Sequence, residues 1–172
     1  MTADGRTADR IAACVGVWKT ISVGTYPSRS ALHDALVARG VEVGDLAGQM
    51  LRLPTFKLAA PARLELARIA VRELVPGSER TSFADIHAHA IEAGLDLCPA
   101  EAGPQLRLQY PEQGLGEYLV IGMEALPTAD GTPGCFVIGN GGAGLIIVGR
   151  AAGPDEMVAS RSRFVFALRA RS

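Results

Sequence analysis

The residues best suited to chemistry in this chain of 172 residues lie close to one another between positions 87 and 107. Cys98 is a thiol that precedes a proline, and Glu101 follows three residues later. A cysteine becomes a good nucleophile when a base or a nearby cation lowers its pKa. His87 and Arg107 are the residues that could do so. A small hydrolase or transferase with Cys98, Glu101 and His87 as catalytic residues is therefore one hypothesis.

The same residues also fit a structural role. Free cysteine is commonly buried as a small apolar side chain, and Cys98 would then close a corner between a helix and a strand. His87 lies four residues from both Phe83 and Ile91, within an apolar stripe. This spacing favours a packed histidine over a catalytic one. We therefore expect packing to be the main role of both residues.

A run of alternating polar and apolar residues follows the cysteine. Gln105, Arg107 and Gln109 alternate with leucines and a tyrosine, which predicts a half-buried strand over 105–110. Alternate side chains of a strand lie about 7 Å apart on one face. Amide and guanidinium groups on such a face can bind a carboxylate, a phosphate or a partner's backbone.

The predicted ligand-binding residues are therefore Gln105, Arg107, Gln109 and Glu124. A solvent-exposed face on which Arg107 pairs across strands with Glu117 or Glu124 explains the pattern equally well. No catalytic constellation is complete in the sequence. The leading hypothesis is thus a small binding or interaction module, with the enzyme as the alternative.

Two further patterns are weaker. Asp85, His89 and Glu92 lie on one face of a predicted helix, and a metal ion accepts such ligands. An ordinary solvated face explains them better, since no H-E-x-x-H motif accompanies them. The segment 139–144 matches G-x-G-x-x-G, but a strand-like sequence follows it, which favours a tight hairpin over a dinucleotide loop. We predict neither a metal nor a cofactor.

Composition excludes several classes of protein. The net charge of -1 and the pI of about 6.3 provide no general basic field for nucleic acid or an anionic membrane. No apolar run is long enough for a membrane span, and the first 25 residues lack a signal-peptide core. The three cysteines form no C-x-x-C motif. We expect a cytoplasmic protein that binds another protein or a small anionic ligand and can form a homo-oligomer.

Arginine supplies all but two of the 17 basic residues. Four arginines gather near the C-terminus, at positions 161, 163, 169 and 171. A solvated strand face and tail is the expected role for them. An anion or phosphate contact is the functional alternative, although no aromatic residues alternate with the arginines.

Helix signals concentrate in the first part of the chain. The spacing of apolar residues predicts helices over 28–39, 44–51 and 82–93. Ser28 and Ser82 are good N-caps, and Gly40 stands where a left-handed residue ends a helix. The segment 62–74 fits both the helical and the strand period, so periodicity leaves it open.

Strand and turn signals dominate the second part. Alternation and turn residues predict strands over 17–23, 105–110, 117–125, 135–138, 145–148 and 163–168. Asp130-Gly131 and Asn140-Gly141 are hairpin signals. The fold class is therefore α+β, with three N-terminal helices packed on one face of a mainly antiparallel five- to six-stranded sheet. We expect one domain over 16–172, preceded by an arm or weak helix over 1–15.

Several stretches together resemble a family of small uncharacterised bacterial proteins. The W-K-x-I motif at 18–21 and the C-P-A-E-x-G-P-Q-L-R-L-Q-Y motif at 98–110 carry the resemblance, which runs from about 18 to 166. It implies no biochemical function. It favours a strand at 64–74, where relatives are more β-branched. This chain departs from the family in its Ala- and Arg-rich 62–74 segment and its glycine-rich 140–144 segment.

Overall fold

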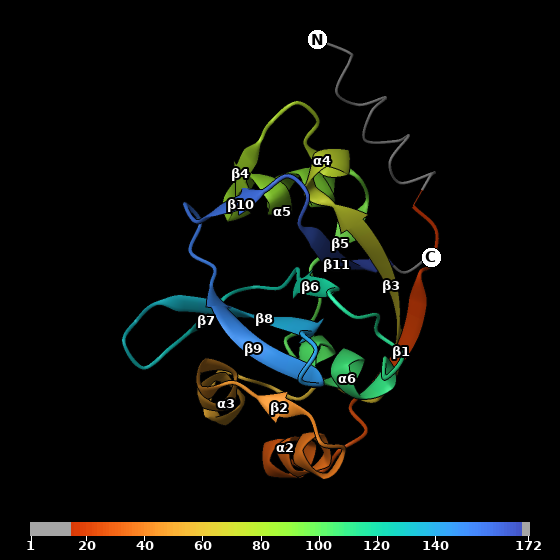
Figure 1. Ribbon diagram of the computed structural model, residues 1–172, viewed down its shortest axis with the longest axis vertical. Coiled ribbons are helices and arrows are strands. Elements are labelled where there is room, and N and C mark those ends of the chain that lie inside the picture. Colours follow the sequence, from red (N-terminus) through yellow and green to blue (C-terminus); the bar gives the residue numbers. More distant parts are fainter. Residues whose placement is uncertain (1–14, 170–172) are drawn as a thin grey trace.

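A strongly curved sheet of nine strands is the framework of the protein, of which a computed structural model describes residues 15–169 (Figure 1). Its strands are β1 (Lys19–Val23), β2 (Glu42–Val43), β3 (Ala62–Ala70), β5 (Leu95–Asp96), β6 (Tyr118–Ile121), β7 (Leu126–Pro127), β8 (Pro133–Asn140), β9 (Leu145–Ala151) and β11 (Arg163–Leu168). A separate ribbon pairs β4 (Arg80–Ser82) with β10 (Met157–Ala159). The helices in this part of the chain are α2 (Arg29–Ala38), α3 (Asp45–Arg52), α4 (Val71–Leu74), α5 (Phe83–Glu92) and α6 (Ala102–Gln109).

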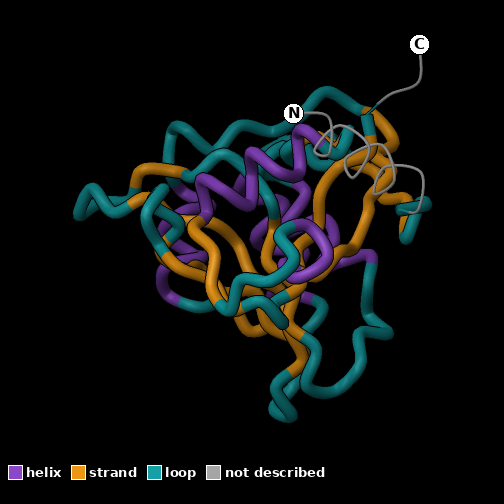
Figure 2. The backbone as a smooth tube through the Cα atoms, turned by 90° about the horizontal axis from the view of Figure 1, so that it is seen from above, coloured by secondary structure: helices purple, strands orange, loops and turns teal. Residues whose placement is uncertain are grey.

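The strands follow the order β1-β3-β11-β6-β8-β9-β2 and bend into half a barrel. Strand β5 pairs with β11, and β7 pairs with β8. The β11–β6 and β2–β9 pairs are parallel, whereas the other pairs are antiparallel, so the sheet is mixed. Figure 2 shows helices and strands intermingled rather than stacked as two layers.

The expected architecture of three helices on one face of a mainly antiparallel five- to six-stranded sheet is therefore wrong. Strands β2, β5 and β7 have two residues each, which is too short for any alternation to show in the sequence. Parallel pairing joins segments that are distant in the chain, and local turn signals carry no information about it. The expected arm or weak helix over 1–15 lies almost wholly outside the described residues.

The expected helices are present as α2, α3 and α5. The Ser28 hydroxyl accepts a hydrogen bond from the Ala31 N–H at 3.0 Å, and Ser82 caps α5 in the same way. Gly40 ends α2 with φ of 72°, a conformation that favours glycine. None of the helices within 15–169 has the length and apolar character needed to cross a membrane.

The ambiguous segment 62–74 contains both kinds of structure in succession. Strand β3 runs to Ala70, and the single turn α4 follows at once. The Glu73 carboxylate accepts the Ala70 N–H at 2.7 Å, which fixes the switch from strand to helix. The resemblance-based expectation of a strand at 64–74 is thus confirmed for 64–70, and the helical alternative holds only for the turn 71–74.

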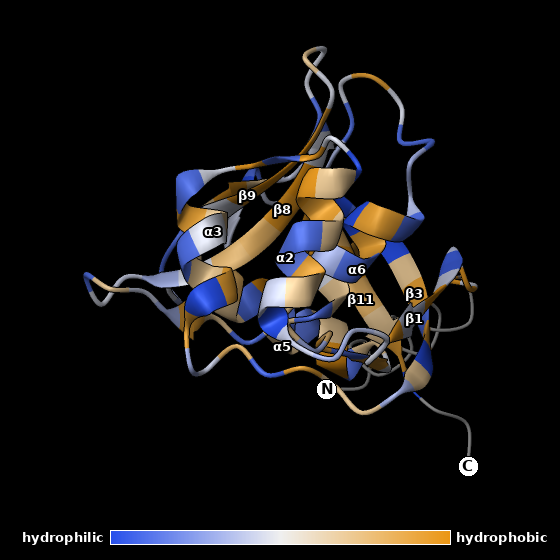
Figure 3. Cartoon of the chain, turned by 90° about the horizontal axis from the view of Figure 1, so that it is seen from below, coloured by the Kyte–Doolittle hydropathy of each residue, from blue (hydrophilic) through white to orange (hydrophobic). Residues whose placement is uncertain are grey.

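The expected strand over 105–110 is wrong, because this stretch forms helix α6. The helix contacts β1 on one side and β8 and β9 on the other, with α2 packed beside it (Figure 3). Every residue of α6 from Ala102 to Leu108 is buried. In a helix surrounded by protein, alternation of polar and apolar residues says nothing about an exposed face. Pro104 is tolerated because it stands in the first turn, where backbone N–H groups have no helical partner.

A cluster of aromatic side chains packs between α5 and β11. The Phe164 and Phe166 rings stack with centroids 5.7 Å apart, and the His87 ring meets Phe166 edge-on at 6.2 Å. Gly122 lies directly against this stack, since a Cβ atom there would lie 2.2 Å from a carbon of the Phe166 ring. Only glycine fits at this position, directly after β6, without moving the ring.

Gly122→Ala should therefore destabilise the protein by about 2 kcal/mol, because overpacking a filled core forces side chains and backbone apart. Urea unfolding monitored by circular dichroism measures the change. Gly114→Ala is the matched control, because a Cβ atom there meets nothing within 4 Å, and its effect should stay within about 0.5 kcal/mol. Equal effects of the two substitutions would contradict this account of the core.

Candidate functional site

One side of α6 bonds to the outer edge of β1. The Gln109 amide accepts the Ser22 N–H at 2.8 Å and donates to the Ser22 carbonyl at 2.9 Å. It thus makes the two hydrogen bonds that a neighbouring strand would make. Gln105, one turn earlier, accepts from Gln109 and donates to the Thr25 hydroxyl at 2.8 Å. These two predicted ligand-binding residues are therefore occupied within the protein.

Glu101 continues this row at the start of α6. Its carboxylate accepts hydrogen bonds from the Gly24 N–H, from the Ala59 N–H at 3.1 Å and from the Gln105 amide at 3.2 Å. The side chain is buried. These hydrogen bonds hold the loop after β1 and the segment before β3 against the start of α6. A carboxylate held in this way positions backbone and is poorly placed to exchange protons with a substrate.

Arg107 points to the opposite side of α6. Two residues along a helix correspond to a rotation of about 200°, so its guanidinium faces away from Gln105 and Gln109. It donates to the Tyr110 carbonyl at 2.7 Å, to the Gly139 carbonyl at 3.0 Å and to the Gln113 side chain. Its exposed fraction is 1%. Gln105, Arg107 and Gln109 therefore do not form the common face that the strand prediction required.

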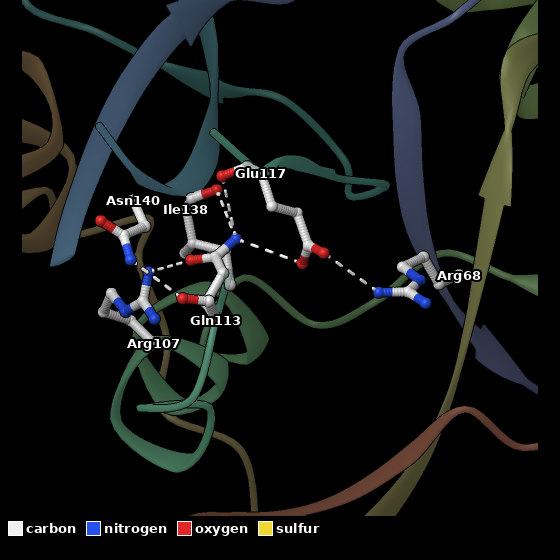
Figure 4. Close-up of polar contacts among 6 residues, drawn as sticks. All are labelled: Arg68, Arg107, Gln113, Glu117, Ile138 and Asn140. Carbon is white, nitrogen blue, oxygen red and sulfur yellow. Dashed lines mark hydrogen bonds and ion pairs between the residues drawn. The ribbon is translucent and has the colours of Figure 1, made fainter. Parts of the chain in front are cut away.

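A chain of polar groups leads from this buried guanidinium towards the surface (Figure 4). The Gln113 amide donates to the Ile138 carbonyl at 3.4 Å and lies within 3.5 Å of the Glu117 carboxylate. Glu117 in turn pairs with Arg68 at 3.2 Å. Burial lowers the pKa of Arg107 to about 10, while Tyr110 and Glu117 oppose that shift. The group remains charged at neutral pH. These acceptors satisfy its two terminal nitrogens, whereas Nε has no partner among the described residues.

Cys98 and His87 lie in apolar surroundings. The Cys98 thiol donates to the Val165 carbonyl at 3.6 Å, and burial raises its pKa to about 12. Burial also lowers the pKa of His87, whose ring packs edge-on against Phe83 and Phe166. Because the thiolate is the nucleophile, this geometry does not support a catalytic cysteine.

The two weaker sequence patterns have structural explanations. Within residues 15–169, no group of three or more His, Cys, Asp or Glu side chains could hold a metal ion, so Asp85, His89 and Glu92 do not form such a site. The glycine-rich segment 139–144 comprises the last two residues of β8 and the hairpin turn 141–144 that leads to β9, and Asn140 pairs with Leu145 across this turn. The expected hairpin is therefore confirmed.

Two of the predicted site residues do meet at a cleft of about 430 Å³. Cys98 lies at its floor, and Glu124 is exposed on one wall. The opposite wall is the stretch 55–59, which carries the exposed Lys57. Pro99, Ala100, Ala125, Leu126 and Pro127 complete a mostly apolar lining. This cleft is the candidate functional site.

Sequence reasoning missed Lys57, Gln113 and Asn140. Lys57 is one of two lysines in an arginine-rich chain, which is the only signal that could have singled it out. Gln113 stands in a turn, and no period or motif marks it. The Asn140-Gly141 pair marked a hairpin but gave no sign of a role for the Asn140 side chain. The Asn140 amide donates to the Gln113 carbonyl at 2.9 Å, a contact that only the folded chain creates.

Comparisons of the chain with protein-family models, curated proteins and solved structures found no match. The resemblance to a family of small bacterial proteins therefore stays a prediction, and the function has to be argued from the geometry.

Arg107→Lys should destabilise the protein by about 2 kcal/mol or more, because a lysine cannot reach several acceptors at once and leaves buried carbonyls unpaired. Urea unfolding measures this, and hydrogen exchange should show faster opening of the 110–117 loop. Arg161→Lys, at an exposed position, is the control and should change stability by less than about 0.5 kcal/mol. An unchanged midpoint for Arg107→Lys would contradict the role given to the network.

Cys98 should react slowly with iodoacetamide near neutral pH in the folded protein. A rise of the pKa from 9.0 to about 12 lowers the thiolate fraction about a thousandfold. Peptide mapping by mass spectrometry gives the rate at Cys98 separately from the other thiols, and protein unfolded in urea provides the reference rate. If Cys98 in the folded protein is alkylated at a rate within about tenfold of that reference, the result would support a catalytic role for Cys98.

Proposed function

We propose that this protein is a non-catalytic interaction module that holds an extended peptide segment of a partner protein in the cleft between 55–59 and Glu124–Pro127. The observation that carries the proposal is unpaired backbone on one wall. The N–H groups of Lys57 and Leu58 donate no hydrogen bond to any described residue, although their neighbours on both sides do. Adjacent N–H groups of an extended chain point to opposite sides, so one of the two can pair with the backbone of an added peptide segment.

The wall with the unpaired backbone is held firmly at both ends. On one side, the Phe56 N–H donates to the Leu53 carbonyl at 3.0 Å, and the Phe56 ring packs edge-on against Phe136 at 5.9 Å. On the other side, Glu101 accepts the Ala59 N–H. A wall that is ordered before binding loses little conformational entropy when the ligand arrives. Glu101 thereby supports the cleft without touching the ligand.

The lining of the cleft defines the ligand's chemistry. The apolar part of the lining, which includes Ala100 and Leu126, accepts small or aliphatic side chains. Glu124 and Lys57 carry opposite charges on opposite walls and are both exposed. A peptide with a basic residue near Glu124 and an acidic residue near Lys57 would complement both walls.

The proposal predicts a shared motif among peptides selected on the full chain from a random library displayed on phage. Peptides that bind the natural chain should carry a basic residue within a small apolar stretch. Glu124→Lys should weaken those peptides about tenfold, or about 1.4 kcal/mol. A selection on that variant should favour an acidic residue at the same position of the motif.

Glu79→Lys is the matched control, because it makes the same charge change at an exposed position that does not line the cleft. It should leave both affinity and motif unchanged. The proposal fails when no motif is enriched, or when the selected peptides bind Glu124→Lys as tightly as the natural chain.

A further inference from the structure

A second hollow lies where β6 and β11 begin side by side, and it shares no lining residue with the cleft. Its volume is about 480 Å³, and its lining comprises Leu115, Gly116, Glu117, Tyr118, Val120, Arg161, Ser162 and Arg163. None of these residues lines the cleft proposed to bind a peptide. The hollow gathers two of the C-terminal arginines next to an aromatic residue, an arrangement that the sequence did not reveal.

The hollow carries net positive charge. Arg161 and Arg163 are both exposed, and among the described residues neither makes a hydrogen bond or an ion pair through its side chain. The carboxylate of the lining belongs to Glu117, which is already paired with Arg68. Two guanidinium groups therefore remain available for carboxylates from outside.

An apolar and aromatic surface borders the two arginines. Leu115 is 77% exposed and Tyr118 is 47% exposed, so both offer apolar surface to a ligand beside the arginines. The Tyr118 ring lies against Gly139, where a Cβ atom would come within 2.4 Å of the ring. This contact restricts the positions open to the ring before any ligand binds. Tyrosine and arginine are also residues that protein interfaces favour.

The buried network keeps this surface in place. The Gly116 N–H donates to the Asn140 carbonyl at 2.8 Å, and the Asn140 N–H donates to the Glu117 carbonyl at 3.1 Å. The Gln113 side chain accepts a hydrogen bond from Arg107 and donates one to the Glu117 carbonyl of the same loop. On the other wall, the Ser162 carbonyl accepts the Val71 N–H at 2.9 Å. The hollow is therefore a preformed surface and not a gap between loose loops.

We propose that this hollow binds an acidic segment of a partner protein. Carboxylates of the segment pair with Arg161 and Arg163, and an aliphatic or aromatic side chain packs against Leu115 and Tyr118. Charge complementarity selects an acidic occupant, and the exposed leucine and tyrosine select one that also carries an apolar residue. The site is independent of the cleft and goes beyond its proposed function.

The test uses a fluorescent synthetic peptide of glutamates around one central leucine, with binding to the full chain measured by anisotropy. Arg161→Glu combined with Arg163→Glu should weaken binding about tenfold or more, since attraction becomes repulsion. Higher salt should weaken it as well. Replacing the leucine of the peptide by glycine should also lower the affinity, because the apolar contact is lost.

Two controls separate this site from the cleft and from general charge effects. Arg63→Glu changes the charge equally at an exposed position outside the hollow, and it should leave binding unchanged. Glu124→Lys should leave it unchanged too, so failure of one site is distinguishable from failure of the other. The proposal is overturned when Arg63→Glu weakens binding as much as the double variant, or when a single-stranded oligonucleotide binds the hollow more tightly than the peptide.

Discussion

Burial of the Arg107 guanidinium constrains much of this structure. Removing such a charge from water costs several kcal/mol unless its donors find acceptors. The acceptors here come from Tyr110, Gln113 and Gly139, which belong to the end of α6, the following loop and β8. The guanidinium therefore joins segments that are distant in the chain, and the loop and hairpin have to adopt positions that bring these oxygens together.

Helix α6 makes hydrogen bonds to two distant parts of the curved sheet because its polar residues point in two directions. Glu101 and Gln109 bond to β1 and the loop after it, and Arg107 bonds to the hairpin of β8 and β9. The polar residues for which a binding site was predicted at 98–109 therefore make hydrogen bonds within the protein. Their effect on binding is indirect, since Glu101 orders one wall of the cleft and Arg107 orders the loop beside the hollow.

Local signals predicted the elements that are determined locally. Ser28, Gly40 and Ser82 mark helix ends through hydrogen bonds and φ values that depend on a few neighbouring residues. The strand predicted at 105–110 failed because alternation indicates a face only when one side meets solvent, and α6 meets protein on all sides. The cleft was half predictable. Cys98 was predicted as a catalytic residue and Glu124 as a ligand-binding residue, whereas Lys57 reaches their neighbourhood only through the long-range fold.

The amide of Gln109 also has a consequence for how copies of this protein meet. Strand β1 is the terminal strand of the sheet, and an exposed terminal strand is a template on which another chain can continue the sheet. Gln109 occupies the Ser22 N–H and carbonyl that such a chain would need. The side chain of Gln109 thereby blocks continuation of the sheet at Ser22, where another chain would have to pair.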